Sequence, residues 1–226
     1  MSTSAASIAS PATPSRPSHP LAIIFDFDGT LADTLSAIIK LINEHAAEYR
    51  FTPLGEKDIE MMRGMSNLEI IKKYHIPIIK LPAFMLHIQN ELHQRIHKVE
   101  LFPGVKELVL GLKVRGIRLG ILTSNSRENV KKLLQARGID VFDFVHSESN
   151  IFGKTRALEH LLRKYGLRKE ETLYVGDETR DIEACQRAGI PVAAVTWGFH
   201  RQDLLRAKGP TFLVDTPAEI EAIVTA

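Results

Sequence analysis

The amino-acid sequence predicts an α/β fold, in which a parallel β-sheet is covered by helices on both faces and is interrupted by a small all-helical domain. Short apolar runs bounded by turn residues alternate with helical patterns along most of the chain, and parallel strands need such crossover helices. From about residue 34 to residue 100, however, only helical periodicity occurs. The sequence therefore predicts a sheet domain over 21–33 and 101–226 and a helical cap over 34–100.

The expected strands are the apolar runs themselves, whose length and bounding turn residues are typical of buried strands. They cover residues 21–28, 118–125, 143–147, 172–177, 191–197 and 211–215. Helices are expected over 104–115, 127–137, 154–165, 180–188 and 217–225. In the last one, Thr216, Pro217 and Glu219 match an N-cap, a first helical residue and a capping-box acid. The cap helices are expected over 34–49, 56–63, 67–75 and 82–98.

Composition narrows the class of protein. The 226 residues are 44% hydrophobic, which is enough for a buried core, and 29 Lys and Arg nearly balance 27 Asp and Glu. The net charge of +2 gives no field that would favour nucleic acid or an anionic membrane as a partner. No apolar stretch approaches the roughly 20 residues of a membrane helix. The single cysteine, Cys185, rules out an intrachain disulfide and favours a reducing, cytoplasmic location.

Residues 1–20 are rich in Ser, Ala and Pro and contain no acidic residue. Such a composition buries too little apolar surface to offset the entropy of ordering, so we expect a disordered tail. An organelle transit peptide is the alternative, because those segments are also Ser-rich and poor in acids.

Polar side chains follow the expected strands where each one ends. Since ligands of open parallel sheets bind beyond the carboxyl ends of the strands, we expect these side chains to share one rim. They are Asp26, Asp28 and Gly29 at the end of the first strand, Thr123 and Ser124 at the end of the second, and Asp177 at the end of the fourth, with Asp181 four residues later and Lys154 at the start of a helix.

Crowded carboxylates repel one another unless a cation compensates their charge. Magnesium prefers oxygen ligands and is commonly held by one or two carboxylates together with a substrate phosphate. Asp26, Asp177 and the backbone carbonyl of Asp28 suit such an ion. The sequence therefore predicts a Mg²⁺ site that receives a phosphorylated substrate.

The same rim supplies the groups for phosphoryl transfer. Asp26 can attack phosphorus and form an aspartyl phosphate, and Asp28 can protonate the leaving oxygen and later activate water. Gly29 allows the sharp turn between strand and helix. Thr123, the Ser124 amide and the Lys154 ammonium would bind the phosphate oxygens.

At these residues the sequence resembles the haloacid dehalogenase superfamily, in particular its phosphoglycolate phosphatase-like hydrolases with a helical cap. The resemblance rests on DFDGTLADT, GILTSN, Lys154 in IFGK and YVGDETRDIEA. It implies a doubly wound, Rossmann-like core, Asp26 as nucleophile, Asp28 as acid and base, and Mg²⁺ on Asp26, Asp28 and Asp177, with Asp181 helping to hold the metal site. The dehalogenases lack the acid at Asp28, which counts against dehalogenation. Thr155 departs from the proline that follows the lysine in many relatives.

The resemblance also implies a small phosphorylated metabolite as substrate, with phosphoglycolate as the first candidate, and a monomer or homodimer. A phosphomutase of the β-phosphoglucomutase type is one alternative, because it uses the same aspartate but returns the phosphoryl group to a sugar. A non-catalytic module that binds phosphate or a partner is another. Steady release of inorganic phosphate from simple esters would favour the phosphatase.

Three further side chains have two interpretations each. Arg63 precedes an expected cap helix and is a candidate to bind a substrate's anionic end, or it is a solvated arginine. His93 and His97 have a spacing that can bind zinc, but no third ligand is apparent, so a solvated helix face is the simpler interpretation. Trp197 ends an expected strand and either lines the pocket or packs at the edge of the core.

Overall fold

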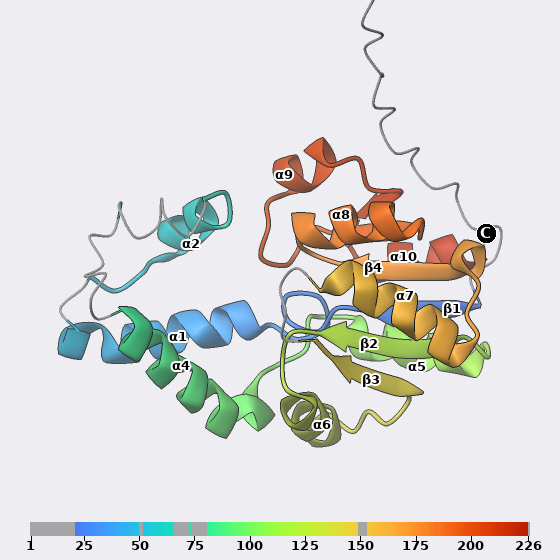
Figure 1. Ribbon diagram of the computed structural model, residues 1–226. Helices are drawn as coiled ribbons and strands as arrows, with labels where there is room; N and C mark the ends of the chain where they lie inside the picture. The colour runs from blue at the N-terminus through green and yellow to red at the C-terminus, as the bar shows by residue number, and fades with distance from the viewer. Residues whose placement is uncertain (1–20, 50–51, 66–72, 74–80, 149–152, 226) are drawn as a thin grey trace, which may run out of the picture.

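Six parallel strands form one sheet in the computed structural model, which describes residues 21–49, 52–65, 73, 81–148 and 153–225 (Figure 1). The strands are β1 (Ala22–Phe25), β2 (Arg118–Thr123), β3 (Phe144–Ser147), β4 (Thr172–Gly176), β5 (Val192–Val195) and β6 (Phe212–Val214). Their order in the sheet is β3-β2-β1-β4-β5-β6, and every neighbouring pair is parallel. The predicted doubly wound α/β fold is thus confirmed.

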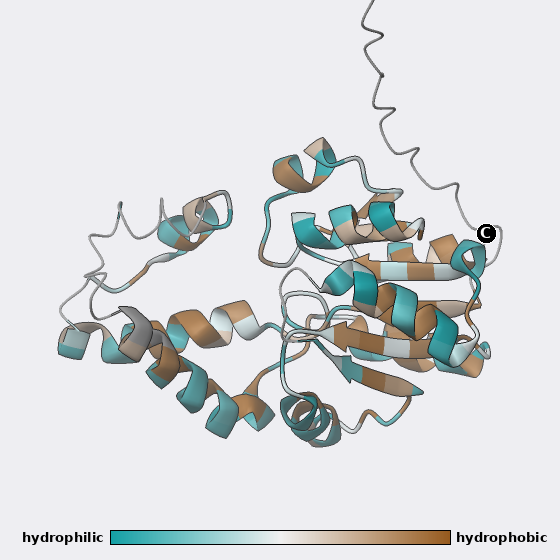
Figure 2. Ribbon diagram, in the orientation of Figure 1, coloured by the Kyte–Doolittle hydropathy of each residue, from teal (hydrophilic) through white to brown (hydrophobic). Residues whose placement is uncertain are grey.

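Helices cover both faces of the sheet because successive side chains of a strand point to opposite faces. Ile23, Phe25 and Val175 pack on one face against α5 (Val105–Val114), α6 (Arg127–Ala136) and α10 (Pro217–Thr225). Ile24 and Tyr174 pack on the other face against α7 (Lys154–Tyr165), α8 (Thr179–Ala188) and α9 (Gln202–Ala207). In Figure 2 hydrophobic residues dominate β2, whereas hydrophilic residues occupy much of the visible side of α7.

Between β1 and α5 the elements that the structure describes are helices, joined by turns and coil. They are α1 (Thr34–Tyr49), α2 (Glu56–Met62), α4 (Leu81–Arg95) and the short 3-10 helix η2 (Ile96–Lys98). Leu41 of α1 packs against Phe84 and Ile88 of α4 in a small apolar cluster of its own. These helices lie to one side of the sheet (Figure 1), beyond the ends of β1 and β2.

The expected elements differ from the observed ones mainly at their ends. The strands stop two or three residues earlier than the apolar runs where polar rim residues follow, as at Phe25 and Thr123. The helix α9 was not expected, and the expected helix over 67–75 falls almost entirely outside the described residues. In the part of the chain that is described, no helix is both long and apolar enough to cross a membrane.

Candidate active site

The site lies where the order of the strands reverses. β1 sits between β2 and β4, so that the connections leaving β1 and β4 run to opposite sides of the sheet. Such a reversal opens a crevice at the carboxyl ends of the strands. Asp26 follows β1, Thr123 ends β2, and Asp177 follows β4. The fold therefore brings together side chains that are far apart in the sequence.

Lys154 joins two aspartates at the centre of this crevice. Its Nζ donates to Oδ2 of Asp26 at 2.7 Å and also to Oδ1 of Asp181. The other oxygen of Asp26 accepts a hydrogen bond of 2.7 Å from the Phe27 amide. Asp26 is only 4% exposed. One buried ammonium is thus shared by two buried carboxylates, which excludes a freely solvated role for Lys154.

Asp177 is fully buried and both its oxygens are occupied. Oδ1 accepts from the Thr30 hydroxyl and Oδ2 from the Phe199 amide, each at 2.7 Å. Two glycines make this packing possible. A Cβ on Gly29, which has φ of +75°, or on Gly198 would overlap the Asp177 side chain. Gly29 therefore serves a close approach as well as the predicted turn.

Three carboxylates form a group that could hold a cation. Oxygens of Asp26, Asp177 and Asp181 all lie within 4.8 Å of one another, and all three residues are buried. Lys154 is the only ammonium that an ion pair joins to this group in the described residues, so the negative charge exceeds the positive. A buried, all-oxygen donor set with excess negative charge fits Mg²⁺. The predicted ligands Asp26, Asp177 and Asp181 are brought together, whereas the Asp28 side chain is not part of this group.

The charges of the site shift its pKa values strongly. Burial raises the pKa of Asp26 from 3.8 to about 7, although Lys154 opposes the shift. Burial, followed by the charges of Asp26 and Asp181, raises the pKa of Asp177 well above its ordinary value. Burial lowers the pKa of Lys154, but the two carboxylates outweigh it and raise that pKa overall. Such opposed shifts are typical of functional sites.

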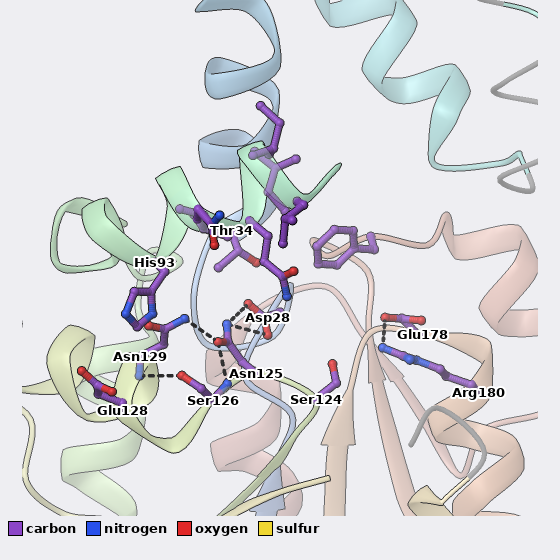
Figure 3. Close-up of a pocket in the computed structure, with 17 residues that line it drawn as sticks. Asp28, Thr34, His93, Ser124, Asn125, Ser126, Glu128, Asn129, Glu178 and Arg180 are labelled. Atoms are coloured by element: carbon purple, nitrogen blue, oxygen red, sulfur yellow. Dashed lines mark hydrogen bonds and ion pairs between the residues drawn. The ribbon is translucent and has the colours of Figure 1, made fainter. Parts of the chain in front are cut away.

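The Asp28 carboxylate is hydrogen-bonded to residues at the end of β2 and just after it. Asn125 Nδ2 donates to both of its carboxylate oxygens, at 3.0 and 3.2 Å, and the Thr123 hydroxyl donates to one of them at 3.4 Å. Burial raises the pKa of Asp28, while the hydrogen bond from Asn125 lowers it in part. Figure 3 shows Asn125 between Asp28 and Asn129. Sequence reasoning placed Asn125 at the end of the strand but gave it no role.

A cavity of about 780 Å³ opens beside Asp28, between the strand ends and the helices α1 and α4; Asp26, Lys154 and Asp177 are not among the residues that line it. Asp28, Ser124 and Asn125 line it from the sheet side, and Leu86 and His93 line it from α4. Glu178 and Arg180, which form an ion pair of 2.7 Å, line another side (Figure 3). Apolar and polar groups therefore both face the space where a substrate would lie.

The remaining candidates lie in different places. Arg63 is not among the residues that line the cavity; its Nη2 donates to the Thr196 carbonyl at 2.7 Å. Its role in substrate binding stays a prediction. His93 is half-buried and lines the cavity, and in the described residues neither it nor His97 belongs to a group of three potential metal ligands. Trp197 packs against the core, and its Nε1 donates to the Thr30 carbonyl at 3.1 Å.

Comparisons with known proteins agree with this arrangement. The family model of the haloacid dehalogenase-like hydrolases matches residues 23–195. The phosphoglycolate phosphatase of Synechococcus elongatus is 38% identical over 205 residues, which cover 90% of this chain and 97% of the relative. A pyrophosphatase, PpaX of Halalkalibacterium halodurans, is 28% identical over 206 residues, covering 89% of this chain and 95% of the relative.

Solved structures share the fold. A predicted phosphoglycolate phosphatase from Haemophilus somnus superposes with a TM-score of 0.75 at 24% identity, over 90% of this chain and 97% of the other. At that identity the likeness concerns the fold alone. The family match spans residues 23–195, a range that contains Asp26, Lys154 and Asp177.

Proposed function

The chain belongs to the haloacid dehalogenase-like hydrolase family, and we propose that this phosphatase hydrolyses a small phosphorylated metabolite with Mg²⁺, through an aspartyl phosphate on Asp26. One observation carries the proposal. Lys154 bridges Asp26 and Asp181 beside a third buried carboxylate, Asp177. A nucleophile, a phosphate-binding cation and a metal-binding donor set therefore meet at one point.

In the first step, an oxygen of Asp26 attacks phosphorus and forms the acyl-phosphate bond. The bond from phosphorus to the ester oxygen breaks, and its electron pair leaves with that oxygen. Asp28 gives the leaving oxygen a proton, so that the alcohol departs neutral. Asp28 lines the cavity from the sheet side, where a leaving group would lie.

In the second step, water attacks the phosphorus of the aspartyl phosphate. Asp28, now ionised, takes a proton from that water, and the electron pair of the acyl-phosphate bond returns to Asp26. Inorganic phosphate leaves and both carboxyl groups are restored. The two steps replace one difficult displacement with two easier ones.

Charge compensation lets an anionic ester approach these carboxylates. Mg²⁺, held by Asp26, Asp177 and Asp181 and, as the resemblance implies, by Asp28, would neutralise charge on the phosphoryl oxygens. Lys154, the Thr123 hydroxyl and the Ser124 amide would hold those oxygens by directed hydrogen bonds. The helical segment 34–100 would act as the cap that keeps bulk water from the intermediate.

Phosphoglycolate is the first candidate substrate. The support is the Synechococcus relative at 38% identity, which is named a phosphoglycolate phosphatase. Pyrophosphate comes second, from the name of a relative at 28% identity. The cavity of about 780 Å³ is large enough for either anion.

The test is a screen of phosphomonoesters and pyrophosphate, with and without Mg²⁺, that measures released inorganic phosphate. We expect turnover that needs the metal and is abolished by Asp26→Asn. Asp203→Asn is the matched control, because Asp203 is an exposed aspartate that forms an ion pair with Arg201 outside the site. When an ester labelled in its phosphoryl group is the substrate, acid quenching should trap the label on the parent protein and not on Asp26→Asn.

Other outcomes would point to the alternatives. Interconversion of hexose phosphates that needs a bisphosphate primer would identify a mutase. A protein that binds phosphate esters without turning any over would be a binding module. Equal activity of Asp26→Asn and the parent would refute the mechanism.

A further inference from the structure

The side-chain amide of Asn125 is held on both sides. Its Nδ2 donates to both oxygens of Asp28, and its Oδ1 accepts 2.8 Å hydrogen bonds from the Ser126 amide and from Asn129 Nδ2. A backbone amide can only donate, so the atom that faces Ser126 must be the oxygen. The NH₂ group of Asn125 must therefore face Asp28.

The backbone of Asn125 is fixed as well. Its amide donates to the Thr123 hydroxyl at 2.9 Å, and its carbonyl accepts from Ser147 Oγ at 2.5 Å. Asn129, which supports the amide oxygen, is buried in α6. Asn125 is thus anchored to the ends of β2 and β3 and to α6 before it reaches Asp28. Little freedom remains for the group that contacts the carboxylate.

We propose that Asn125 is a positioning residue, which fixes the Asp28 carboxylate in the orientation needed for proton transfer at the phosphoryl group on Asp26. This inference rests on the proposed function. Asp28 lies on the turn after β1, and its carboxylate accepts hydrogen bonds from Asn125 and Thr123, while the Thr34 hydroxyl is close enough to lower its pKa as well. Asn125 Nδ2 holds both carboxylate oxygens at once, whereas the 3.4 Å bond from Thr123 reaches only one of them. Misplacement of such a group by about 1 Å costs roughly 100-fold in rate.

The test compares Asn125→Ala and Asn125→Ser with the control Asn43→Ala. Asn43 also makes two side-chain hydrogen bonds, to the backbone of Leu54 at 2.9 and 2.7 Å, but lies in α1 away from Asp28. Each protein is assayed for kcat and KM with phosphoglycolate or the best alkyl phosphate of the screen. The pre-steady-state burst of nitrophenolate from para-nitrophenyl phosphate is measured in parallel, because that leaving group needs no proton from Asp28.

For Asn125→Ala we expect kcat on the alkyl ester to fall by about 10- to 100-fold with KM changed less than about threefold. The rate of the nitrophenolate burst should stay within about threefold of the parent, since bond cleavage there needs no general acid. Asn125→Ser, which keeps a donor, should recover part of the lost kcat. Asn43→Ala should lower the thermal midpoint without this kinetic pattern.

Three results would overturn the inference: an unchanged kcat, a rise in KM alone, which would make Asn125 a substrate-binding group, or an equal fall in the burst rate and the alkyl-ester rate. If Asn125→Ala does not fold, the same two rates are measured on Asn125→Ser, where kcat on the alkyl ester should fall by less and the burst rate should again be unchanged. A parent protein that turns over no ester in the screen would instead refute the proposed function.

Discussion

Lys154 Nζ lies 2.7 Å from Asp26 Oδ2, although the two residues are separated by 128 positions in the sequence. The same ammonium contacts Asp181, and the Lys154 side chain is only 12% exposed. A buried ammonium without its partners, or buried carboxylates without theirs, would cost several kcal/mol. The three side chains therefore depend on one another for stability as well as for chemistry.

Replacing Lys154 should reduce both activity and stability. In Lys154→Met we expect kcat to fall by about 100-fold or more, because a charged donor to the phosphoryl oxygens is lost. The free energy of unfolding should fall by about 3–5 kcal/mol, because Asp26 and Asp181 are left buried without their cation. Steady-state rates and chemical denaturation measure the two effects.

Lys113→Met is the matched control. Lys113 pairs with Asp143 at 2.7 Å, but both side chains are more than one-third exposed. Solvent screens such a pair, so we expect a change of about 0–1 kcal/mol and normal activity. Comparable losses in the two variants would contradict the role given to Lys154.

The stability of the metal-free protein should depend on pH, and part of that dependence should come from Asp26. Its pKa is about 7 in the folded state against 3.8 as the ordinary value, so between these pH values the folded protein holds a proton that the unfolded chain releases. The free energy of unfolding therefore falls as the pH rises through this window. Asp26→Asn removes the contribution of Asp26, so the difference in the free energy of unfolding between variant and parent should shift in favour of the variant, by a few kcal/mol at most, from about pH 5 to about pH 8.

Denaturant titrations in the presence of a chelator measure this difference. Asp203→Asn is again the control. Its hydrogen bond with Arg201 lowers the pKa of Asp203, so that carboxylate is ionised in the folded and the unfolded state from about pH 5 to about pH 8. The difference in the free energy of unfolding between Asp203→Asn and the parent should therefore stay constant over this range. A constant difference for Asp26→Asn as well would show that the folded-state pKa of Asp26 is not raised.

The fold and the rim were predictable because both follow from short-range patterns. Apolar runs, turn residues and helix caps are local, and the capping signal at Thr216 and Glu219 predicted α10 with its observed bounds, Pro217–Thr225. Strand ends then converge by topology alone, which is why Asp26, Lys154 and Asp177 were found together.

The parts that sequence reasoning missed depend on long-range or backbone contacts. Asn125 donates a hydrogen bond to Asp28, which lies 97 positions away in the sequence. The local sequence Thr-Ser-Asn does not show whether the asparagine binds a carboxylate or caps a helix. The Phe199 contact to Asp177 comes from a backbone amide, which any residue supplies. The helix α9 has six residues and buries only Leu205, so its periodicity is too brief to detect.

Mg²⁺ should stabilise the protein through the three carboxylates. A ligand that binds only the folded state raises the free energy of unfolding, and here it also relieves repulsion among Asp26, Asp177 and Asp181. We expect the thermal midpoint of the parent to rise with Mg²⁺ concentration and that of Asp177→Asn to respond weakly. Asp203→Asn should respond like the parent. An unchanged midpoint of the parent at saturating Mg²⁺ would contradict the proposed metal site.

Gly198 should tolerate no side chain. A Cβ there would overlap the Asp177 side chain and the Gly29 carbonyl, so Gly198→Ala must displace one of them. We expect a loss of about 1–3 kcal/mol in the free energy of unfolding from overpacking, together with weaker activation by Mg²⁺. Gly55→Ala is the control, because its Cβ would make only an ordinary contact of 3.6 Å with Asp58. Equal Mg²⁺ activation of the parent and Gly198→Ala would show that Asp177 has not moved.

Arg63 also ties α2 to the end of β5, a role distinct from the predicted binding of a substrate's anionic end. Its guanidinium donates to the Thr196 carbonyl at the end of β5, 133 positions away, and pairs with Glu60. A hydrogen bond from a charged donor contributes about 1.5–3 kcal/mol, so in Arg63→Met we expect kcat/KM to fall by about tenfold or more for every ester, whatever the charge of its leaving group. Arg187→Met, which removes an exposed arginine paired with Glu183, should leave kcat/KM unchanged. A loss confined to esters that carry a carboxylate, such as phosphoglycolate, would instead support Arg63 as the group that binds the anionic end of the substrate.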